Sequence, residues 1–270
     1  MAALLVLCGT LSAQEHDFLE NDVEIGDIEP SWIVHDGTLY FLDYREGATI
    51  EVPRSAITLT EHGYIAAETH LGTMVLIPGT GRFETFFPEH RTGERLESRR
   101  AWLIDEVFPY EWPPDIGIES ITASSFFQEY VGGELVQYVP ENLLHRFYSE
   151  RESPFMFNEC ALPWAEGQPD SGVGATLTIQ FNGRKNLLTI LNGYVDYDRM
   201  HLYRDNGRVR SMRVASDEGD FSFVYEFEDY VHFADITLPG RVSGVTLEIL
   251  DVYEGRRYSD TCISAIFSNP

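Results

Sequence analysis

Three segments of the chain alternate apolar and polar residues with a period of two. They read ATLTIQF at 175–181, FSFVYEF at 221–227 and GVTLEIL at 244–250. The apolar side chains that alternation places on one face are Leu177, Ile179 and Phe181 in the first segment, Phe221, Phe223, Tyr225 and Phe227 in the second, and Val245, Leu247 and Ile249 in the third. Such alternation is typical of strands with one buried face. With glycine and asparagine turns between them, the pattern predicts an all-β fold in which residues 118–270 form a jelly-roll β-sandwich.

The preceding part of the chain carries its own strand signals. SWIVHDGTLYFLDY has two apolar runs around Asp36-Gly37, a strong hairpin turn signal. Gly63 in ITLTEHGYIAAET and Pro78-Gly79 in TMVLIPGTGRFETFF predict two further turns. We therefore expect a small strand-rich β domain at 31–108, with residues 88–108 as its one credible helix or connector.

A proline-rich segment marks the expected domain boundary. Pro109, Pro113 and Pro114 fall in PYEWPPDIG and break regular structure. We expect a linker at 109–117, with the jelly roll following it.

The N-terminus resembles a secretory signal. Residues 2–13 are an apolar stretch with a small residue at its end, and polar sequence follows at once. We expect a signal peptide at 1–13, an acidic linker at 14–30, and an exported protein: periplasmic, cell-surface or secreted. Lipid attachment at Cys8 is the alternative, but Leu7 stands where that signal needs a small residue.

The charge balance excludes two partner classes. Asp and Glu number 44 against 19 Lys and Arg, which gives a formal net charge of -25. Such a surface repels nucleic acid and anionic lipid, so neither is an expected partner.

Two cysteines remain if Cys8 leaves with the signal. Cys160 and Cys262 could form a disulfide, as suits an exported chain. The alternative is two separate buried thiols. A metal site is not expected, because neither lies in a Cys-x-x-Cys pair.

The common enzyme signatures are absent from the sequence. It contains no His-Glu-x-x-His, no Gly-x-Ser-x-Gly and no phosphate loop. We therefore expect no enzymatic activity. The remaining enzyme hypothesis is an unrecognised active site within 32–108, where His35, His62, His70 and His90 lie at or near expected turns.

Six segments of the back half resemble a known family in order and spacing. They are ASSFF at 123–127, YVPENLL at 138–144, PWAEGQPDSGVG at 163–174, ILNGY at 190–194, LYRDNGRVRSMRV at 202–214 and ILDVYEGRRYSDTCISAI at 249–266. Together they resemble the discoidin-like (galactose-binding-like) NADase-type glycan-binding domain over about residues 118–270. The matched positions are Trp164, Glu166, Gly167, Gly172, Gly174, Asn192, Gly193, Tyr194, Asn206, Arg208, Asp251, Tyr253, Gly255, Tyr258, Asp260 and Thr261.

The resemblance implies a carbohydrate-recognising sandwich, and side-chain chemistry selects the candidate contacts. An indole or phenol ring can stack on a sugar, and amide, carboxylate and guanidinium groups can hydrogen-bond to it. The ligand-binding candidates are Trp164, Glu166, Asn192, Tyr194, Asn206, Arg208, Tyr253 and Tyr258. Each also has a structural alternative: a core ring, a turn residue or a solvated arginine.

Arginines gather in this part of an otherwise acidic chain. Arg204, Arg208, Arg210 and Arg213 are close in sequence, and Arg256 and Arg257 could join them if the loops converge. Converging arginines would suit acidic or sulfated sugars. The alternative is cross-strand pairing with the abundant carboxylates.

The chain departs from the family pattern at two places. Ser264-Ala265-Ile266 stands where similar domains often read Ser-Glu-Ile, which removes a carboxylate from the structural calcium site of discoidin-like domains. HRFYSERESPFMFNECAL at 145–162 replaces a shorter loop and brings Cys160 near Trp164. No cofactor is expected.

These observations lead to one prediction and one alternative. We expect an exported, non-catalytic glycan-binding protein that acts through the C-terminal jelly roll, with turns distant in sequence meeting at one end of the sandwich. The alternative is an envelope or adhesion protein that uses the jelly roll to bind a protein partner.

Overall fold

A computed structural model describes most of the chain. The described residues are 32–35, 38–43, 48–69, 72–79, 82–86, 117–145, 162–196 and 199–268. They form two compact units, residues 1–54 and 55–270, which are described separately below.

The first unit contains a three-stranded antiparallel meander. Its strands are β1 (Trp32–His35), β2 (Thr38–Asp43) and β3 (Ala48–Pro53). His35 pairs with Thr38, as the predicted hairpin requires. Asp36 and Gly37, where the turn was predicted, lie outside the described residues.

The second unit begins with a four-stranded antiparallel sheet. After the 3-10 turn η1 (Arg54–Ala56) come β4 (Ile57–Leu59), β5 (Ile65–Thr69), β6 (Gly72–Gly79) and β7 (Arg82–Phe86). The predicted turn around Gly63 is confirmed by the pairing of Leu59 with Ile65. The turn predicted at Pro78-Gly79 is wrong, because both residues belong to β6 and pair with β7. Proline is tolerated there because β5 pairs only with residues 72–76, so no partner needs the missing N–H.

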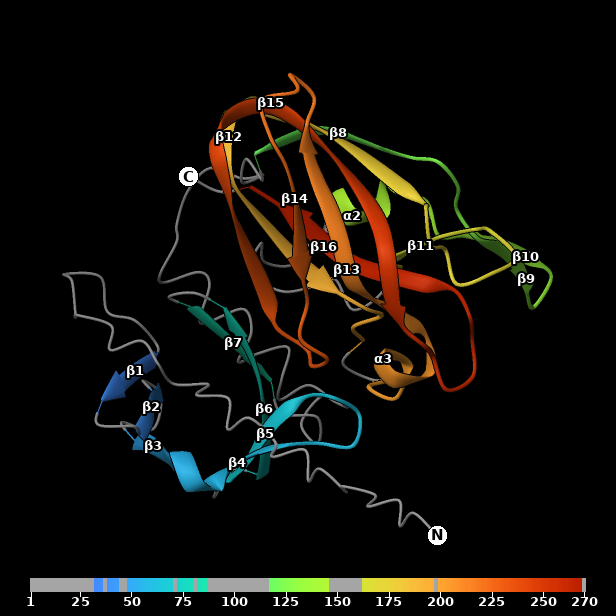
Figure 1. Ribbon diagram of the computed structural model, residues 1–270. Coiled ribbons are helices and arrows are strands. Elements are labelled where there is room, and N and C mark those ends of the chain that lie inside the picture. Colours follow the sequence, from blue (N-terminus) through green and yellow to red (C-terminus); the bar gives the residue numbers. More distant parts are fainter. Residues whose placement is uncertain are drawn as a thin grey trace, which may run out of the picture. The chain divides into compact units, whose positions relative to one another are not determined.

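The back half is a β-sandwich, which confirms the predicted fold class (Figure 1). Its strands are β8 (Ile118–Ala123), β9 (Gln128–Val131), β10 (Glu134–Gln137), β11 (Trp164–Ala165), β12 (Thr176–Asn192), β13 (Gly207–Ser216), β14 (Ser222–Glu226), β15 (Phe233–Tyr253) and β16 (Thr261–Phe267). Two short helices accompany them, α2 (Asn142–His145) and α3 (Leu202–Asp205).

The long strands β12 and β15 run together as an antiparallel ribbon through both layers of the sandwich. Residues 177–181 of β12 pair with β8, and residues 189–192 pair with β16. The register shifts between Gln180 and Leu187, where the ribbon bends from one layer to the other. The sheet order is β11-β16-β12-β15-β13-β14, and a parallel pairing of β13 with β16 joins the layers at one end.

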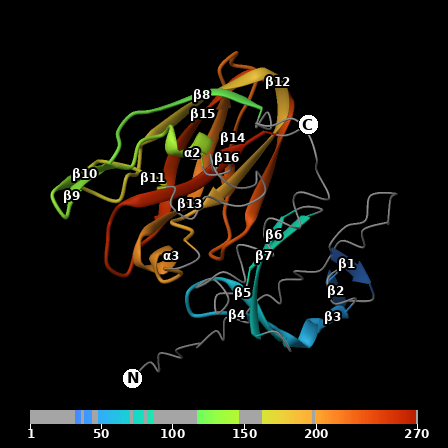
Figure 2. The same cartoon turned by 180° about the vertical axis from the view of Figure 1, so that it is seen from behind.

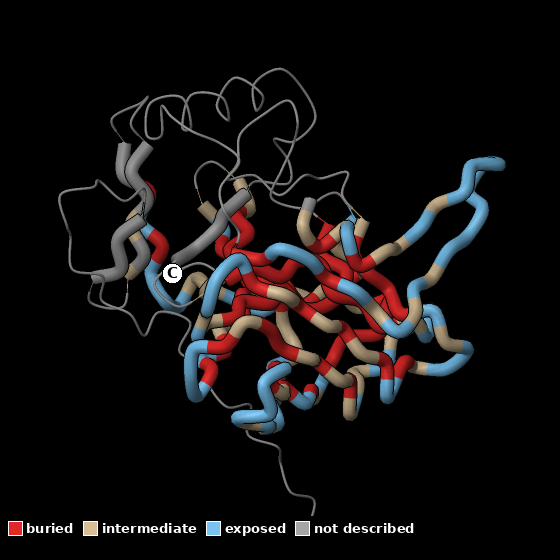
Figure 3. Tube along the Cα trace, turned by 90° about the horizontal axis from the view of Figure 1, so that it is seen from above, coloured by how far each residue is buried: buried red, intermediate tan, exposed pale blue. Residues whose placement is uncertain are grey.

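Alternation along the strands fills the core. Leu177, Ile179 and Phe181 are all buried, as are Val245, Leu247 and Ile249. The third predicted row packs on the same core, with Phe227 buried and its other three members partly buried. Figure 3 shows this buried core continuing along the length of the sandwich.

One hairpin projects from the sandwich (Figures 2 and 3). Strands β9 and β10 pair only with each other, through a turn in which Gly132 and Gly133 both have positive φ (63° and 93°). Glycine at both positions allows the two-residue turn that matches strand twist.

The turn between β4 and β5 is packed into the end of the sandwich. Val231 N donates to Gly63 O (2.8 Å), and the fully buried Tyr64 exchanges hydrogen bonds with Asp196 through its hydroxyl (3.2 Å each). The rings of Tyr64 and Tyr203 meet edge to face at 6.1 Å. The β4–β7 sheet is therefore attached to the sandwich by specific packing.

Several sequence predictions lie outside the described residues. They are the signal peptide at 1–13, the acidic linker at 14–30, the helix or connector at 88–108, and residues 109–116 of the linker. The proposed domain boundaries therefore stay predictions. Within the part of the chain that the structure describes, no helix is long and apolar enough to cross a membrane.

We predict that Gly63→Ala destabilises the protein much more than Gly219→Ala. Both glycines have positive φ (86° and 79°), so each substitution strains the backbone by about 1 kcal/mol. A Cβ at Gly63 would lie 2.7 Å from ring carbons of Tyr203, whereas nothing lies within 4 Å of one at Gly219. Overpacking adds about 1–3 kcal/mol at Gly63 alone. Urea unfolding of the two variants measures the difference; equal losses would mean that the turn does not pack on Tyr203 in solution.

Candidate functional site

Five loops meet at the end of the sandwich that carries α3, and we call this end the rim. The described residues of the rim are 124–127, 166–175, 193–196, 199–206, 227–232 and 254–260. Backbone hydrogen bonds hold its loops to β11, to β16 and to one another: Phe127 N to Ala165 O (2.9 Å), Gly193 N to Cys262 O (3.0 Å), Glu166 N to Thr261 O (3.1 Å) and Tyr258 N to Asp205 O (2.9 Å). The segments of Trp164, Tyr194 and Tyr258 therefore lie at the same end, as expected from the sequence.

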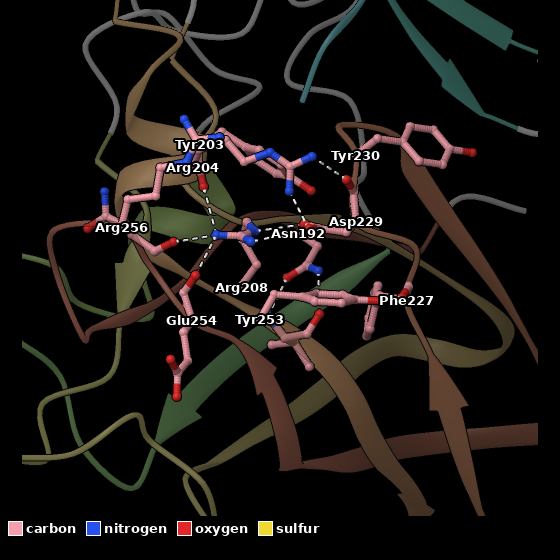
Figure 4. Close-up of polar contacts among 12 residues, drawn as sticks. Asn192, Tyr203, Arg204, Arg208, Phe227, Asp229, Tyr230, Tyr253, Glu254 and Arg256 are labelled. Carbon is pink, nitrogen blue, oxygen red and sulfur yellow. Dashed lines mark hydrogen bonds and ion pairs between the residues drawn. The ribbon is translucent and has the colours of Figure 1, made fainter. Parts of the chain in front are cut away.

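A buried arginine organises the centre of the rim (Figure 4). The side chain of Arg208 is 5% exposed, and its Nε donates to Asp229 Oδ1 at 2.9 Å. Its Nη1 donates to three carbonyl oxygens, of Asn206 (2.8 Å), Tyr203 (3.4 Å) and Glu254 (3.4 Å). One guanidinium thus holds three rim loops together.

Asp229 also binds a second arginine. Arg204 Nη1 donates to Asp229 Oδ2, and its Nη2 donates to Asp229 O at 2.7 Å. Both guanidiniums lie over the ring of Tyr203, at 5.4 Å for Arg208 and 5.5 Å for Arg204. A buried ring this close to two cations gains cation–π stabilisation.

The predicted candidate Asn192 fixes the start of β13. Its Nδ2 donates to Val209 O (2.7 Å), and its Oδ1 accepts from Val209 N (3.0 Å). Asn206, also buried, caps α3 by donating to Leu202 O at 2.9 Å. In this structure both amides serve the backbone.

The aromatic candidates Trp164 and Tyr194 are inside the protein. Trp164 is fully buried, and its Nε1 donates to Ser125 O at 3.0 Å. Tyr194 is 6% exposed, meets the ring of Tyr138 edge to face, and accepts a hydrogen bond from Arg199 Nη2 at 3.4 Å. Their burial matches the structural alternative for each ring.

Glu166 is fully buried under the loop 167–174. Its Oε2 accepts from Gln168 N at 2.7 Å, while its Oε1 has no hydrogen-bond partner in the described part of the protein. Burial raises the pKa of this carboxyl above its ordinary value, against the lowering effect of the Gln168 hydrogen bond. Gly172 lies against it, since a Cβ there would be 2.3 Å from Glu166 Cγ.

The last two candidates differ in exposure. Tyr253 is half-buried and its hydroxyl donates to Phe227 O at 2.9 Å. Tyr258 is 42% exposed, with the guanidinium of Arg257 over its ring at 5.4 Å. Tyr258 is the predicted candidate with the most accessible ring.

The arginines divide into two groups. Arg210 pairs with Asp251 at 3.2 Å, and Arg213 pairs with Glu248, as the cross-strand alternative predicts. Arg204 and Arg208 pair with Asp229 inside the rim. The backbone of the loop 254–260 brings Arg256 and Arg257 to the same rim, through Arg256 N to Arg204 O (2.9 Å) and Arg257 N to Asp205 O (3.0 Å).

The structure adds two observations on the cysteines and on metal. Cys262 is buried at the rim, with Sγ 3.8 Å from Asp260 O. Cys160 lies outside the described residues, so the disulfide stays a prediction.

Among the described residues, no group of three or more His, Cys, Asp or Glu side chains could hold a metal ion, and Ala265 is buried within β16.

Two residues that organise the rim were not selected from the sequence. Asp229 is one of 44 acidic residues and follows a strand without any motif of its own. Tyr203 lies in a matched segment, but no alternation marks it as buried. Nothing in the sequence marks Arg208 as buried, so no sequence signal pointed to Asp229 as the carboxylate that pairs with it.

Comparison with known proteins finds one family match in the back half of the chain. Residues 155–269 match the model of the family described as NAD glycohydrolase translocation F5/8 type C domain. These residues are similar to discoidin-like domains of this type. A search of curated proteins found no match to the chain.

Solved structures similar to the discoidin-like domain are distant in sequence. The CBM32-1 and CBM32-2 domains of Clostridium perfringens ZmpB are 11% identical, over 58% of this chain and 36% of that chain, with a TM-score of 0.37. The family 32 CBM of C. perfringens NanJ, solved with galactose, is 9% identical, over 55% of this chain and 91% of that chain, with a TM-score of 0.34. Arabinofuranosyltransferase AftD from Mycobacteria is 18% identical, over 54% of this chain and 10% of that chain, with a TM-score of 0.36. At these TM-scores the likenesses carry no argument about function.

We predict that Asp229→Asn lowers the free energy of unfolding by about 2–3 kcal/mol. The substitution leaves two guanidiniums without a carboxylate, one of them 5% exposed. The expected loss is below that for a fully buried pair, because the Asp229 side chain is 32% exposed. Glu248→Gln, which breaks the exposed pair with Arg213, is the control and should lose less than about 1 kcal/mol. Similar losses in urea unfolding would contradict the central role of Asp229.

We predict a pH dependence from Glu166. Because its pKa is raised in the folded state, the folded protein keeps a proton that the unfolded chain releases above the ordinary pKa of 4.5. The stability that this proton contributes is complete below pH 4.5 and is lost as pH rises through the folded-state pKa. Comparison with Glu166→Gln by urea unfolding at several pH values isolates the effect. The stability of the wild type relative to the variant should fall with rising pH; a constant difference would contradict the prediction.

Proposed function

We propose that the discoidin-like domain binds glycan, without catalysis, through the solvent-exposed part of the rim. The observation that carries the proposal is the exposed ring of Tyr258 on a loop fixed by hydrogen bonds. A flat apolar face bordered by polar groups is the usual surface for stacking a sugar ring. The resemblance of residues 118–270 to glycan-binding discoidin-like domains supports the same function.

The loop 254–260 is ordered before any ligand arrives. Its backbone bonds to Arg204 and Asp205 hold three successive residues, and a Cβ at Gly255 would lie 2.2 Å from Tyr258 O. A ring held in place loses little conformational entropy on binding. The loop therefore suits a shallow site whose single-site affinity is weak.

Within this proposal the candidates have different roles. Tyr258 contacts the sugar, and the half-buried Tyr253, at the end of β15, helps to hold the rim through its hydrogen bond to Phe227 O. The buried candidates keep the rim loops in place, and they are Trp164, Glu166, Asn192, Tyr194, Asn206 and Arg208. Export, as the sequence predicts, would bring this surface to extracellular glycans.

We predict that Tyr258→Ala abolishes glycan binding by the full chain, whereas Tyr258→Phe retains most of it. The ring supplies the stacking face, and the hydroxyl is secondary. A glycan array followed by saturation-transfer NMR on each hit measures the effect. Tyr130→Ala is the matched control, because it removes an exposed ring outside the rim (76% exposed). Absence of any glycan hit, or equal binding by Tyr258→Ala, would overturn the proposal.

A second candidate function is protein binding through the projecting β9–β10 hairpin. Four large apolar side chains on or beside it are exposed: Phe126 (41%), Tyr130 (76%), Val131 (54%) and Leu135 (47%). Tyr130 and Leu135 are paired across the strands and so share one face. Such a surface fits the envelope or adhesion alternative.

The two functions can be separated with one pair of variants. A double variant, Tyr130→Ala with Leu135→Ala, should release an envelope protein partner and leave glycan binding intact. Tyr258→Ala should do the opposite. If free sugar releases the partner, the partner binds at the rim and not at the β9–β10 hairpin.

A further inference from the structure

Four arginines lie at the rim of a chain whose net charge is -25. They are Arg204, Arg208, Arg256 and Arg257, and hydrogen bonds join the segments that carry them, from Arg256 N to Arg204 O and from Arg208 Nη1 to Glu254 O. The carboxylates in ion pairs with them are those of Asp229 and Asp205. Asp229 is shared by Arg204 and Arg208, so this buried group retains one positive charge.

The other two arginines are exposed beside Tyr258. The Arg257 side chain is 63% exposed, and its Nη1 lies 3.6 Å from Asp205 Oδ2, beyond hydrogen-bonding distance. Arg256 is also exposed, and its Nη2 reaches the carbonyl oxygen of Glu61 at 3.5 Å. Most of the N–H donors of both guanidiniums thus remain available to a ligand.

Three other exposed arginines, Arg184, Arg210 and Arg213, have closer partners. Arg184 makes two hydrogen bonds with Glu218, at 2.6 Å and 3.0 Å, and Arg213 donates to Glu248. Arg210 lies 3.2 Å from Asp251. The loose contact of Arg257 therefore sets it apart from the cross-strand pairs.

We infer that Arg257, with Arg256 beside it, makes the Tyr258 surface selective for anionic saccharides, those that carry a carboxylate or a sulfate group. The inference rests on the proposed function and names the class of its ligand. The sugar ring stacks on Tyr258, and its anionic group accepts hydrogen bonds from the guanidinium that lies over the same ring. Planar guanidinium donors match the oxygens of either anion.

The net negative charge of the chain opposes the approach of an anionic sugar. At long range the net negative charge repels an anion, so recognition depends on contact at the rim rather than on steering. Charge-assisted contacts at an exposed site weaken as salt screens them. The preference for the anionic sugar should therefore decrease between about 20 mM and about 200 mM salt.

The test compares three oligosaccharides of the same ring type on the full chain: oligogalacturonate, 6-sulfated oligogalactose and neutral oligogalactose. Dissociation constants come from NMR titration at low salt. The wild type should bind both anionic sugars about tenfold more tightly than the neutral one, as one strong charge-assisted contact allows. A difference between the two anionic sugars identifies the anion that the site prefers.

Two variants and one control locate the effect. Arg257→Gln should remove most of the tenfold preference by weakening the binding of the two anionic sugars more than that of the neutral sugar. Arg257→Lys should restore part of the preference by keeping the charge. Arg213→Gln is the matched control, because Arg213 is also partly exposed but lies within β13 and pairs with Glu248. The control should keep the full preference, and urea midpoints should show that all three variants remain folded.

Each contrary outcome has a distinct meaning. Equal binding of neutral and anionic sugars, with Tyr258 still required, overturns the selectivity and leaves the glycan-binding proposal standing. A preference that survives in both Arg257→Gln and Arg256→Gln overturns the assignment to these arginines. Failure of all three sugars and of a glycan array overturns the proposed function and the selectivity with it.

Discussion

A guanidinium taken out of water must find a partner for its charge and acceptors for its N–H groups. Arg208 meets this requirement at the centre of the rim, where Asp229 supplies the charge and carbonyls from the segments around α3 and β15 supply acceptors. The position of the loop 254–260, and with it the exposed ring of Tyr258, follows from this one requirement.

Tyr203 extends the same constraint to the β4–β7 sheet. Its ring lies against two glycines in the left-handed conformation, Gly63 and Gly193, and a Cβ on either would come within 2.7 Å of it. Through Gly63 the ring contacts the turn that precedes β5, and through Gly193 it contacts the end of β12. One aromatic ring thus connects the sandwich, the rim and the sheet before them.

The sequence predicted the strands well because alternation reports directly on which face is buried. The burial of Leu177, Ile179 and Val245 could be predicted without knowing which strands they pair with. The turn at Pro78-Gly79 was placed too early because proline and glycine also occur in a strand where no neighbour needs the N–H. The bend of the β12–β15 ribbon lies at a register shift beside Gly183, whose φ is 78°, and the sequence analysis did not use the Asn182-Gly183 pair that marks it.

The sequence predicted that these loops meet at one end of the sandwich. It did not predict which of their side chains are buried and which face solvent. A matched position such as Trp164 or Asn192 indicates that a residue type is needed, and it does not indicate whether the side chain faces solvent or core. Burial is decided by long-range packing, as between Asn192 and Val209 or Trp164 and Ser125. Exposure of Tyr258 likewise depends on loops that meet only in the folded protein.

The shared ribbon also determines how this half of the protein comes apart. Because β12 and β15 each contribute residues to both layers, neither layer can separate without breaking strands of the other. Melting of the sandwich is therefore a single cooperative event. Amide protons in the two layers should become accessible to solvent together.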